Sequence, residues 1–229
     1  MYIEQLIEYG KKNYDEINGD ELSGDRSWEY CHEIFKKYRN EERTDEAIDL
    51  LCLHLSWYLA SWGMLRNSFL RVYSYKVHKE AVVEIYKDEW RGLWNIDFSK
   101  VGEEYAGQIM ALSAKISEIY KPYLDNARAR LGKTENERIG ITDTLQTKIL
   151  LGTVGCVPAY DTYFKRALVD TKIASSTYGK KSLIALAKHY SDNAFEYEKL
   201  GRYCGKRVSY PSAKILDMCF FQYGYNLNT

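Results

Sequence analysis

Helix-breaking residues and domain linkers are scarce in this sequence. Only 3 of its 229 residues are proline, and no repeat, low-complexity tract or linker interrupts the chain. Strict alternation of apolar and polar residues, the pattern of half-buried strands, is hard to find, whereas apolar residues recur at helical spacing. The sequence therefore predicts an all-α fold, a single globular multi-helix domain that spans residues 1–229.

The cysteines and histidines lack the spacing that metal centres need. The 5 cysteines are widely separated, and no Cys-x-x-Cys pair is present, which excludes the common zinc and iron–sulfur motifs. The 4 histidines show no metal spacing, and His54, in an apolar run, is expected to be a hydrogen-bonded core residue. Walker, nucleophile-elbow and zinc-protease motifs are also missing. We therefore predict no metal and no cofactor, and the scattered thiols favour a reducing cytoplasm.

Neither acidic nor basic residues are in excess. The 32 basic residues balance the 32 acidic ones, so the chain has no global field for nucleic acid or anionic lipid. Binding to a polyanion would need a local patch. The longest uncharged run, residues 50–65, is shorter than the ~20 residues that span a bilayer. The first residues lack a signal-peptide pattern. We expect a cytoplasmic protein with no membrane partner.

Helical periodicity and end signals delimit the expected helices. Thr44, followed by two acids, suits the N-cap of a helix over residues 47–62, and Gly63 suits its end. Pro211 suits the first position of the last helix and Gly224 the position after it. Two further helices are expected near the N-terminus, one that starts at Ile3 and one that carries the apolar stripe from Trp28 to Tyr38. The remaining expected helices cover 77–90, 102–131 (with a kink at Pro122), 142–151, a segment that starts near Thr162, and 181–200. Residues 132–140 are expected to form a long exposed loop.

Tyrosine is abundant, with 21 residues. A tyrosine packs an apolar ring and keeps a polar tip, so a high content suits either a binding surface or an aromatic-rich core. Because the tyrosines are spread along every expected helix, the sequence favours the core interpretation.

The segment 147–164 reads Thr-Lys-Ile-Leu-Leu-Gly-Thr-Val-Gly-Cys-Val-Pro-Ala-Tyr-Asp-Thr-Tyr-Phe. This order predicts a helix, a glycine-containing turn, and a second helix opened by Asp161 or Thr162. Gly152 and Gly155 would let the backbone pass close to another surface. The free N–H groups of the helix that begins near Thr162 would suit a phosphate.

Residues 157–163, Val-Pro-Ala-Tyr-Asp-Thr-Tyr, resemble the apolar-Pro-x-Asp-Thr-His motif of the helix-hairpin-helix DNA glycosylase superfamily. Lys148 is similar to the lysine that some members carry on the preceding helix. The resemblance implies an all-helical fold, DNA as partner and extrusion of a base into a pocket. The chain departs from the family at Thr142, in place of the hairpin's second glycine, and at Tyr163, where histidine is frequent.

The resemblance also implies roles for two residues. Asp161 would be the catalytic carboxylate, which stabilises charge developing on the sugar or activates an attacking group. Lys148 would be the nucleophile that forms a Schiff base. The structural alternative makes Asp161 a helix N-cap, worth about 1 kcal/mol, and Lys148 a solvated helix residue.

Two further segments carry candidate nucleic-acid-binding residues. Arg66 and Asn67 suit contact with a phosphate or a base edge, unless Asn67 or Ser68 simply caps the next helix. Lys206 and Arg207 precede the helix that opens near Pro211 and suit a phosphate site, with a solvated loop as the alternative.

Two hypotheses on function follow from the sequence. The first is a DNA-binding protein with a helix-hairpin-helix glycosylase-like fold that processes base lesions. The second is a non-catalytic accessory protein of a bacterial or phage system that binds another protein. The motif at residues 157–163 makes the first the leading hypothesis, and the second draws on the neutral charge, the tyrosine content and the incomplete hairpin. Whether the chain is an enzyme stays open.

Overall fold

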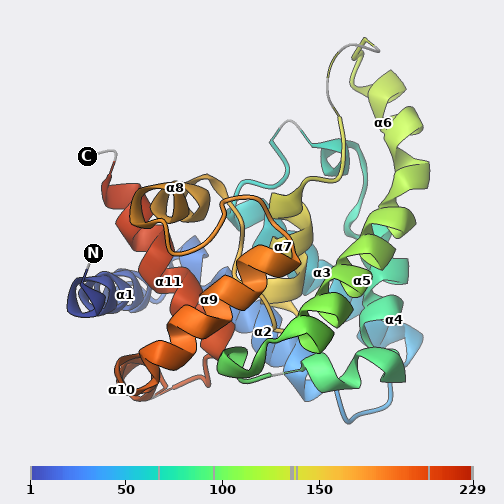
Figure 1. Cartoon of the computed structure of the whole chain (residues 1–229). Helices are drawn as coiled ribbons and strands as arrows, with labels where there is room; N and C mark the ends of the chain where they lie inside the picture. The colour runs from blue at the N-terminus through green and yellow to red at the C-terminus, as the bar shows by residue number, and fades with distance from the viewer. Residues whose placement is uncertain are drawn as a thin grey trace.

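A computed structural model describes residues 2–66, 68–94, 96–134, 137, 139–205 and 207–227. Across these ranges the regular structure is helical and contains no strand, which confirms the predicted all-α class. The helices form one compact body. Figure 1 shows α1, α8, α10 and α11 grouped on one side and α4, α5 and α6 on the other, with α7 between them.

Eleven α-helices and six short 3₁₀ helices follow one another along the described residues. The α-helices are α1 Ile3–Asn18, α2 Ser27–Lys37, α3 Asp45–Ser61, α4 Lys79–Ile85, α5 Glu103–Tyr120, α6 Leu124–Arg130, α7 Asp143–Gly152, α8 Thr162–Thr171, α9 Lys180–Asp192, α10 Ala194–Cys204 and α11 Ser212–Asn226. Short 3₁₀ helices are η1 Gly24–Arg26, η2 Phe69–Val72, η3 Tyr75–His78, η4 Asp88–Leu93, η5 Phe98–Lys100 and η6 Lys121–Tyr123.

Helix α3 buries one side in the core, including Leu55 and Tyr58, and its ends lie close to the positions that the sequence predicts. The Thr44 hydroxyl accepts a hydrogen bond from the Ala47 backbone N–H at 3.3 Å, which satisfies one of the unpaired donors of the first turn. The helix ends at Ser61, and Gly63 adopts a positive φ of 74°, a conformation that glycine accepts without a steric penalty. Within the described residues, no helix is long and apolar enough to span a membrane.

Helix α11 packs along α1 and against α8. The observed bounds of α11 show that both predicted end positions are wrong. Pro211 precedes the helix as its N-cap instead of occupying the first helical position, and Gly224 lies inside the helix instead of after it. A Cβ atom at Gly224 would stand 1.9 Å from the Tyr163 carbonyl oxygen. This glycine therefore allows α8 and α11 to approach closely. From the sequence alone, a glycine with this packing role cannot be distinguished from one that ends a helix.

Two predicted helices are divided. Residues 77–90 belong to η3, α4 and η4, with Tyr86 leaving helical geometry where its ring stacks between those of Phe35 and Trp94. Residues 181–200 belong to α9 and α10. Asn193 separates these two helices, and its amide donates to the His189 carbonyl at 2.8 Å, so a side chain replaces the backbone donor.

The predicted break at Pro122 is confirmed, because α5 ends at Tyr120 and η6 separates it from α6. The predicted loop 132–140 lies outside any helix wherever the structure describes it, although Ile139 is buried. Residues 135, 136 and 138 of this loop lie outside the described ranges.

Aromatic and thiol side chains fill much of the core. Four tyrosines are almost fully buried, which supports the core interpretation for Tyr58, Tyr120, Tyr160 and Tyr197. Every cysteine is buried and free; these are Cys31, Cys52, Cys156, Cys204 and Cys219. Burial raises the pKa of the Cys156 thiol to about 12, so this thiol stays protonated at neutral pH and is a poor nucleophile.

The histidines occupy different environments. The prediction for His54 is wrong, because this residue is only half-buried and its Nδ1 has no hydrogen-bond partner among the described residues. His32 and His78 are instead buried and hydrogen-bonded. His32 Nδ1 lies 3.1 Å from the Thr153 carbonyl oxygen, and His78 Nδ1 lies 2.6 Å from the Tyr120 hydroxyl. Desolvation lowers the pKa of His78 to about 3.

We expect His78 to make folding sensitive to acid. Its folded-state pKa lies below the unfolded value of 6.5, so the unfolded chain binds the proton first. The stabilising contribution is complete above pH 6.5 and decreases by about 1.4 kcal/mol per pH unit as the pH falls toward 3. Urea unfolding from pH 7 to pH 4 should show a smaller loss for His78→Asn than for the wild type. Equal pH slopes for the two proteins would contradict this role.

Candidate functional site

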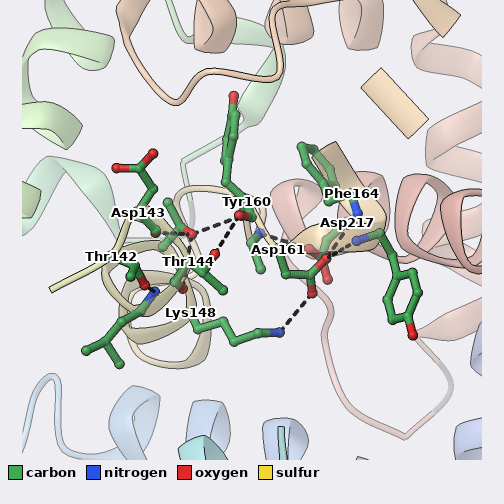
Figure 2. A network of polar contacts seen from close by, with 12 residues as sticks. Thr142, Asp143, Thr144, Lys148, Tyr160, Asp161, Phe164 and Asp217 are labelled. Atoms are coloured by element: carbon green, nitrogen blue, oxygen red, sulfur yellow. Dashed lines mark hydrogen bonds and ion pairs between the residues drawn. The ribbon is translucent and has the colours of Figure 1, made fainter. Parts of the chain in front are cut away.

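The structure brings Lys148 and Asp161 together. Lys148 Nζ lies 3.1 Å from Asp161 Oδ2, and the two residues are 4% and 9% exposed. Figure 2 shows the two side chains pointing toward each other from α7 and from the residue before α8. The prediction of Lys148 as a solvated residue is therefore wrong, because the amine is withdrawn from water into an ion pair.

Asp161 divides its two carboxylate oxygens between two tasks. Oδ1 accepts hydrogen bonds from the Tyr163 and Phe164 backbone N–H groups at 3.1 and 3.0 Å, which confirms its role as the N-cap of α8. Oδ2 is the oxygen that contacts Lys148. The capping bonds hold the carboxylate in a fixed orientation, so the oxygen that meets the amine is pre-positioned.

Threonines of α7 hold the turn that carries Asp161. The Thr147 hydroxyl accepts from the Tyr160 N–H at 2.9 Å, and the Thr144 hydroxyl donates to the Tyr160 carbonyl at 2.9 Å. Thr144 and Lys148 are four residues apart and lie on one face of the helix. The same helix face therefore binds the backbone before Asp161 and presents the lysine to it.

The two glycines of the motif serve packing within the core. A Cβ atom at Gly152 would stand 2.3 Å from the Tyr58 ring, and one at Gly155 would stand 2.7 Å from Pro211. Both glycines are buried, and Gly155 adopts a φ of 74°. The close approach that the sequence predicts therefore occurs against the chain's own side chains, and this placement gives no support to nucleic-acid contact at Gly152 or Gly155.

An open cleft of about 730 Å³ contains the ion pair in its wall. Its lining combines three cations with two carboxylates and with aromatic rings; the residues that concern the chemistry are Trp62, Arg66, Lys148, Asp161, Arg166 and Phe221. The second carboxylate is Asp25. The two segments that the sequence singled out separately, around Arg66 and around Asp161, thus meet at one cleft.

The arginines on the cleft keep donors for a ligand. Arg66 is exposed and, among the described residues, has no ion-pair partner. Arg166 donates to the Gly224 carbonyl at 3.4 Å and lies over the Tyr163 ring. A guanidinium group has five N–H donors, so both arginines retain donors for an anion.

The N-terminus of α8 is a weaker anion site than the sequence predicts. Thr162 is exposed and lines the cleft. However, Asp161 already occupies two of the first N–H groups and places a negative charge at the positive end of the helix dipole. An anion at this position would meet the carboxylate, so the arginines are the better phosphate contacts.

The remaining predicted contacts lie elsewhere. Arg207 is exposed in the segment between α10 and α11 and does not line the cleft. Asn67 and Lys206 lie outside the described residues. The capping alternative for the Arg66 segment receives support, since the Ser68 hydroxyl accepts from the Leu70 N–H at 3.2 Å and opens η2.

A second buried ion pair, which sequence reasoning missed, lies behind the first. Lys214 Nζ is 3.0 Å from Asp217 Oδ2, and the residues are 3% and 5% exposed. The Trp62 ring lies between the lysines, 4.7 Å from Lys148 Nζ and 5.5 Å from Lys214 Nζ. The available signal was Lys214 and Asp217 at helical spacing inside an otherwise apolar segment, since charges on such a face are expected to pair.

Asp217 also holds the turn between α7 and α8. Its Oδ1 accepts from the Ala159 N–H at 2.8 Å, two residues before Asp161. The two ion pairs thus share a tryptophan and a backbone segment, and they form one charged cluster within the core.

Comparisons with known proteins give no family assignment. No family model matches the chain, and no significant match exists among curated proteins or solved structures. Among the described residues, no group of three or more His, Cys, Asp or Glu side chains is placed to hold a metal ion. The functional argument therefore rests on the geometry of the cleft.

Proposed function

We propose that the protein binds DNA at the Lys148–Asp161 cleft and acts there on a damaged nucleotide by glycosylase-like chemistry. The observation that carries the proposal is a buried amine–carboxylate pair in the wall of an open cleft. An ion pair buried for stability alone gains little over an apolar pair. The position of this one beside a cleft of ligand size supports a chemical role.

The pair has the two groups that cleavage of an N-glycosidic bond requires. As the base departs with the bonding electron pair, positive charge develops on the sugar, and the Asp161 carboxylate stabilises it. Lys148 Nζ then attacks C1′ after it transfers a proton to Asp161 Oδ2, its partner at 3.1 Å. The new C1′–N bond becomes an imine when the C1′–O4′ bond breaks and one proton of the amine moves to the ring oxygen, and water later hydrolyses the imine and releases the product.

The remainder of the cleft suits a nucleotide. Trp62 and Phe221 offer ring surfaces for stacking with a base, a contact worth about 1–3 kcal/mol per base. Arg66 and Arg166 suit the flanking phosphates. The cations exceed the carboxylates of the lining by one, so we expect weak attraction for DNA and strong selectivity for an extruded nucleotide.

The test is borohydride trapping on DNA that contains an abasic site. The exposed aldehyde of this site forms an imine with an active-site amine, and borohydride reduces the imine to a stable crosslink. We expect wild type to form the crosslink and Lys148→Arg, which keeps the positive charge but cannot form the imine, to lose at least about 90% of it. The yield is read as a shifted band on a denaturing gel.

Two controls make the assay specific. Lys165→Arg removes the amine of a neighbouring lysine that pairs with Asp143 at 3.6 Å outside the buried pair, and it should crosslink like the wild type. Duplex and single-stranded DNA binding across a salt series should weaken linearly in log salt if phosphates are contacted. Absence of binding at low salt, or equal crosslinking by Lys148→Arg, would falsify the proposal.

One observation favours protein interaction as a second candidate. The Tyr30 and Trp57 rings, on α2 and α3, pack at 5.8 Å yet remain 37% and 44% exposed. Leu53, one turn before Trp57, is also exposed. Exposed aromatic clusters are common at protein interfaces. A protein that fails to bind DNA at low salt would direct attention to this face.

A further inference from the structure

A second cleft, of about 280 Å³, lies between the segment that follows α2 and the segment formed by the end of α4 and η4. It is separate from the Lys148–Asp161 cleft. Asp25 lines that first cleft just before α2 begins, whereas Arg39 lines the second just after α2 ends. The length of α2 between them is roughly 16 Å, given the rise of an α-helix.

Stacked aromatic rings form one wall of this second cleft. The Tyr86 and Trp94 rings stack with centroids 5.2 Å apart, and the Phe35 ring stacks on Tyr86 at 5.8 Å. The Tyr86 hydroxyl donates to the Phe35 carbonyl at 2.7 Å. The Tyr86 ring is therefore held in place both by ring stacking and by the hydrogen bond of its hydroxyl.

Two arginines lie over these rings. The Arg43 guanidinium is 4.6 Å from the Tyr86 ring centroid, and the Arg39 guanidinium is 5.7 Å from the Trp94 ring centroid. A guanidinium that lies over an aromatic ring is restricted in its orientation, while its N–H groups remain free to donate hydrogen bonds within the plane of the guanidinium. Both arginines are therefore partly ordered before any ligand arrives.

The hydrogen bonds of these arginines go to backbone carbonyls. Arg43 donates from Nη1 to the carbonyls of Tyr38 and Glu41 at 3.1 and 3.3 Å. Arg39 donates from Nη2 to the Arg91 carbonyl at 3.3 Å. Neither arginine forms an ion pair with a carboxylate in the described part of the chain, nor does Arg91. Three guanidinium groups thus border one small cleft without a direct ion pair to a carboxylate in the described residues.

The charge balance of the whole lining is positive. Arg39, Arg43, Lys87 and Arg91 face Glu41 and Asp88 around the cleft. Lys87 forms an ion pair with Glu84 at 2.5 Å, so the uncompensated charge belongs to the arginines. Together with Glu84, the carboxylates around the cleft leave a net charge of +1. A ligand that completes this site is therefore an anion that offers several hydrogen-bond acceptors close together.

We propose that this second cleft binds a phosphate-bearing anion, with the arginines donating in pairs to its oxygens. Guanidinium groups match phosphate oxygens with two parallel hydrogen bonds. The volume lies just below the ~300–1,000 Å³ of sites that enclose a drug-sized molecule. The cleft therefore holds phosphate groups and leaves the remainder of the ligand outside. The source is either a free nucleotide or the 5′-phosphate of a nucleic-acid end. This proposal does not depend on the function proposed for the first cleft.

The test is calorimetric titration with inorganic pyrophosphate at low salt. We expect saturable binding by the wild type and a loss of affinity of at least about tenfold for Arg91→Gln. The backbone carbonyl of Arg91 remains available to Arg39 in this variant, so the fold is expected to persist. Arg39→Gln should weaken binding similarly. Arg202→Gln, which removes an exposed arginine of α10 that pairs with Glu198 and lines neither cleft, should bind pyrophosphate like the wild type.

Competition distinguishes the two sources. Displacement of pyrophosphate by ATP but not by a 5′-phosphorylated oligonucleotide assigns a free nucleotide, and the reverse assigns a nucleic-acid end. A matched oligonucleotide with a 5′-hydroxyl should not compete in either case. No binding of pyrophosphate at millimolar concentration, or unchanged affinity in both Arg91→Gln and Arg39→Gln, overturns the proposal.

Discussion

Replacing Asp217 with alanine should lower the free energy of unfolding by about 3–5 kcal/mol, because it leaves the ammonium of Lys214 buried and unpaired. Asp217 is that group's ion-pair partner at 3.0 Å. The same substitution removes the acceptor of the Ala159 N–H, which becomes an unsatisfied buried donor. Urea unfolding, followed by circular dichroism, measures the change. Few substitutions in this chain should destabilise it more.

Two variants identify the cause of this loss. Asp217→Asn keeps an oxygen that can accept from Ala159 but removes the charge, so we expect an intermediate loss. Asp192→Ala breaks a solvent-exposed ion pair with Lys188, at 2.8 Å, and should cost at most about 1 kcal/mol. Losses of the same size for Asp217→Ala and Asp192→Ala would show that burial does not determine the effect.

Gly224→Ala should lower the free energy of unfolding by about 1–3 kcal/mol or more, because the added methyl group overpacks the contact between α8 and α11. The new Cβ would lie 1.9 Å from the Tyr163 carbonyl oxygen and 3.2 Å from the Ala167 nitrogen. Both obstacles are backbone atoms, so relief requires α8 to move. Because Asp161 caps α8, the variant should also trap less abasic DNA, provided that the proposed chemistry is correct.

Gly201→Ala is the matched control for this prediction. Gly201 also lies inside a helix, α10, but its added Cβ would meet no atom closer than Ile215 at 4.0 Å. Alanine in an unobstructed helical position stabilises by roughly 0.5–1 kcal/mol over glycine. The two glycine substitutions are thus expected to shift thermal unfolding in opposite directions, and a stabilising Gly224→Ala would contradict the described packing.

Local signals predicted the parts of the fold that depend on neighbouring residues. The cap at Thr44, the break at Pro122 and the cap at Asp161 were each predicted correctly. In each case a side chain or a proline ring acts on backbone within a few residues. Gly224 failed as a stop signal because its function depends on α8, about 60 residues earlier in the chain, and spacing along one helix carries no such information.

The candidate site was only partly accessible to sequence reasoning. The resemblance of residues 157–163 to glycosylases singled out Lys148 and Asp161 as separate candidates, and the structure places the two groups in contact. The burial of Lys148 could not be predicted, since a lysine on a helix is exposed in most proteins. The convergence of Arg66 on the same cleft required the tertiary fold.

The sequence by itself determined the all-helical class, several helix ends and the absence of cysteine metal motifs, because these follow from composition and from contacts within a few residues. Only the tertiary structure decided which charges are buried. Lys148 enters the core because the residue before another helix, Asp161, supplies a carboxylate at the distance that compensates for lost water. Lys214 pairs with Asp217 on its own helix, and the Trp62 ring, which lies near both lysines, comes from a distant part of the chain. Burial depends on what surrounds a side chain in space, and spacing along one helix gives only part of that information.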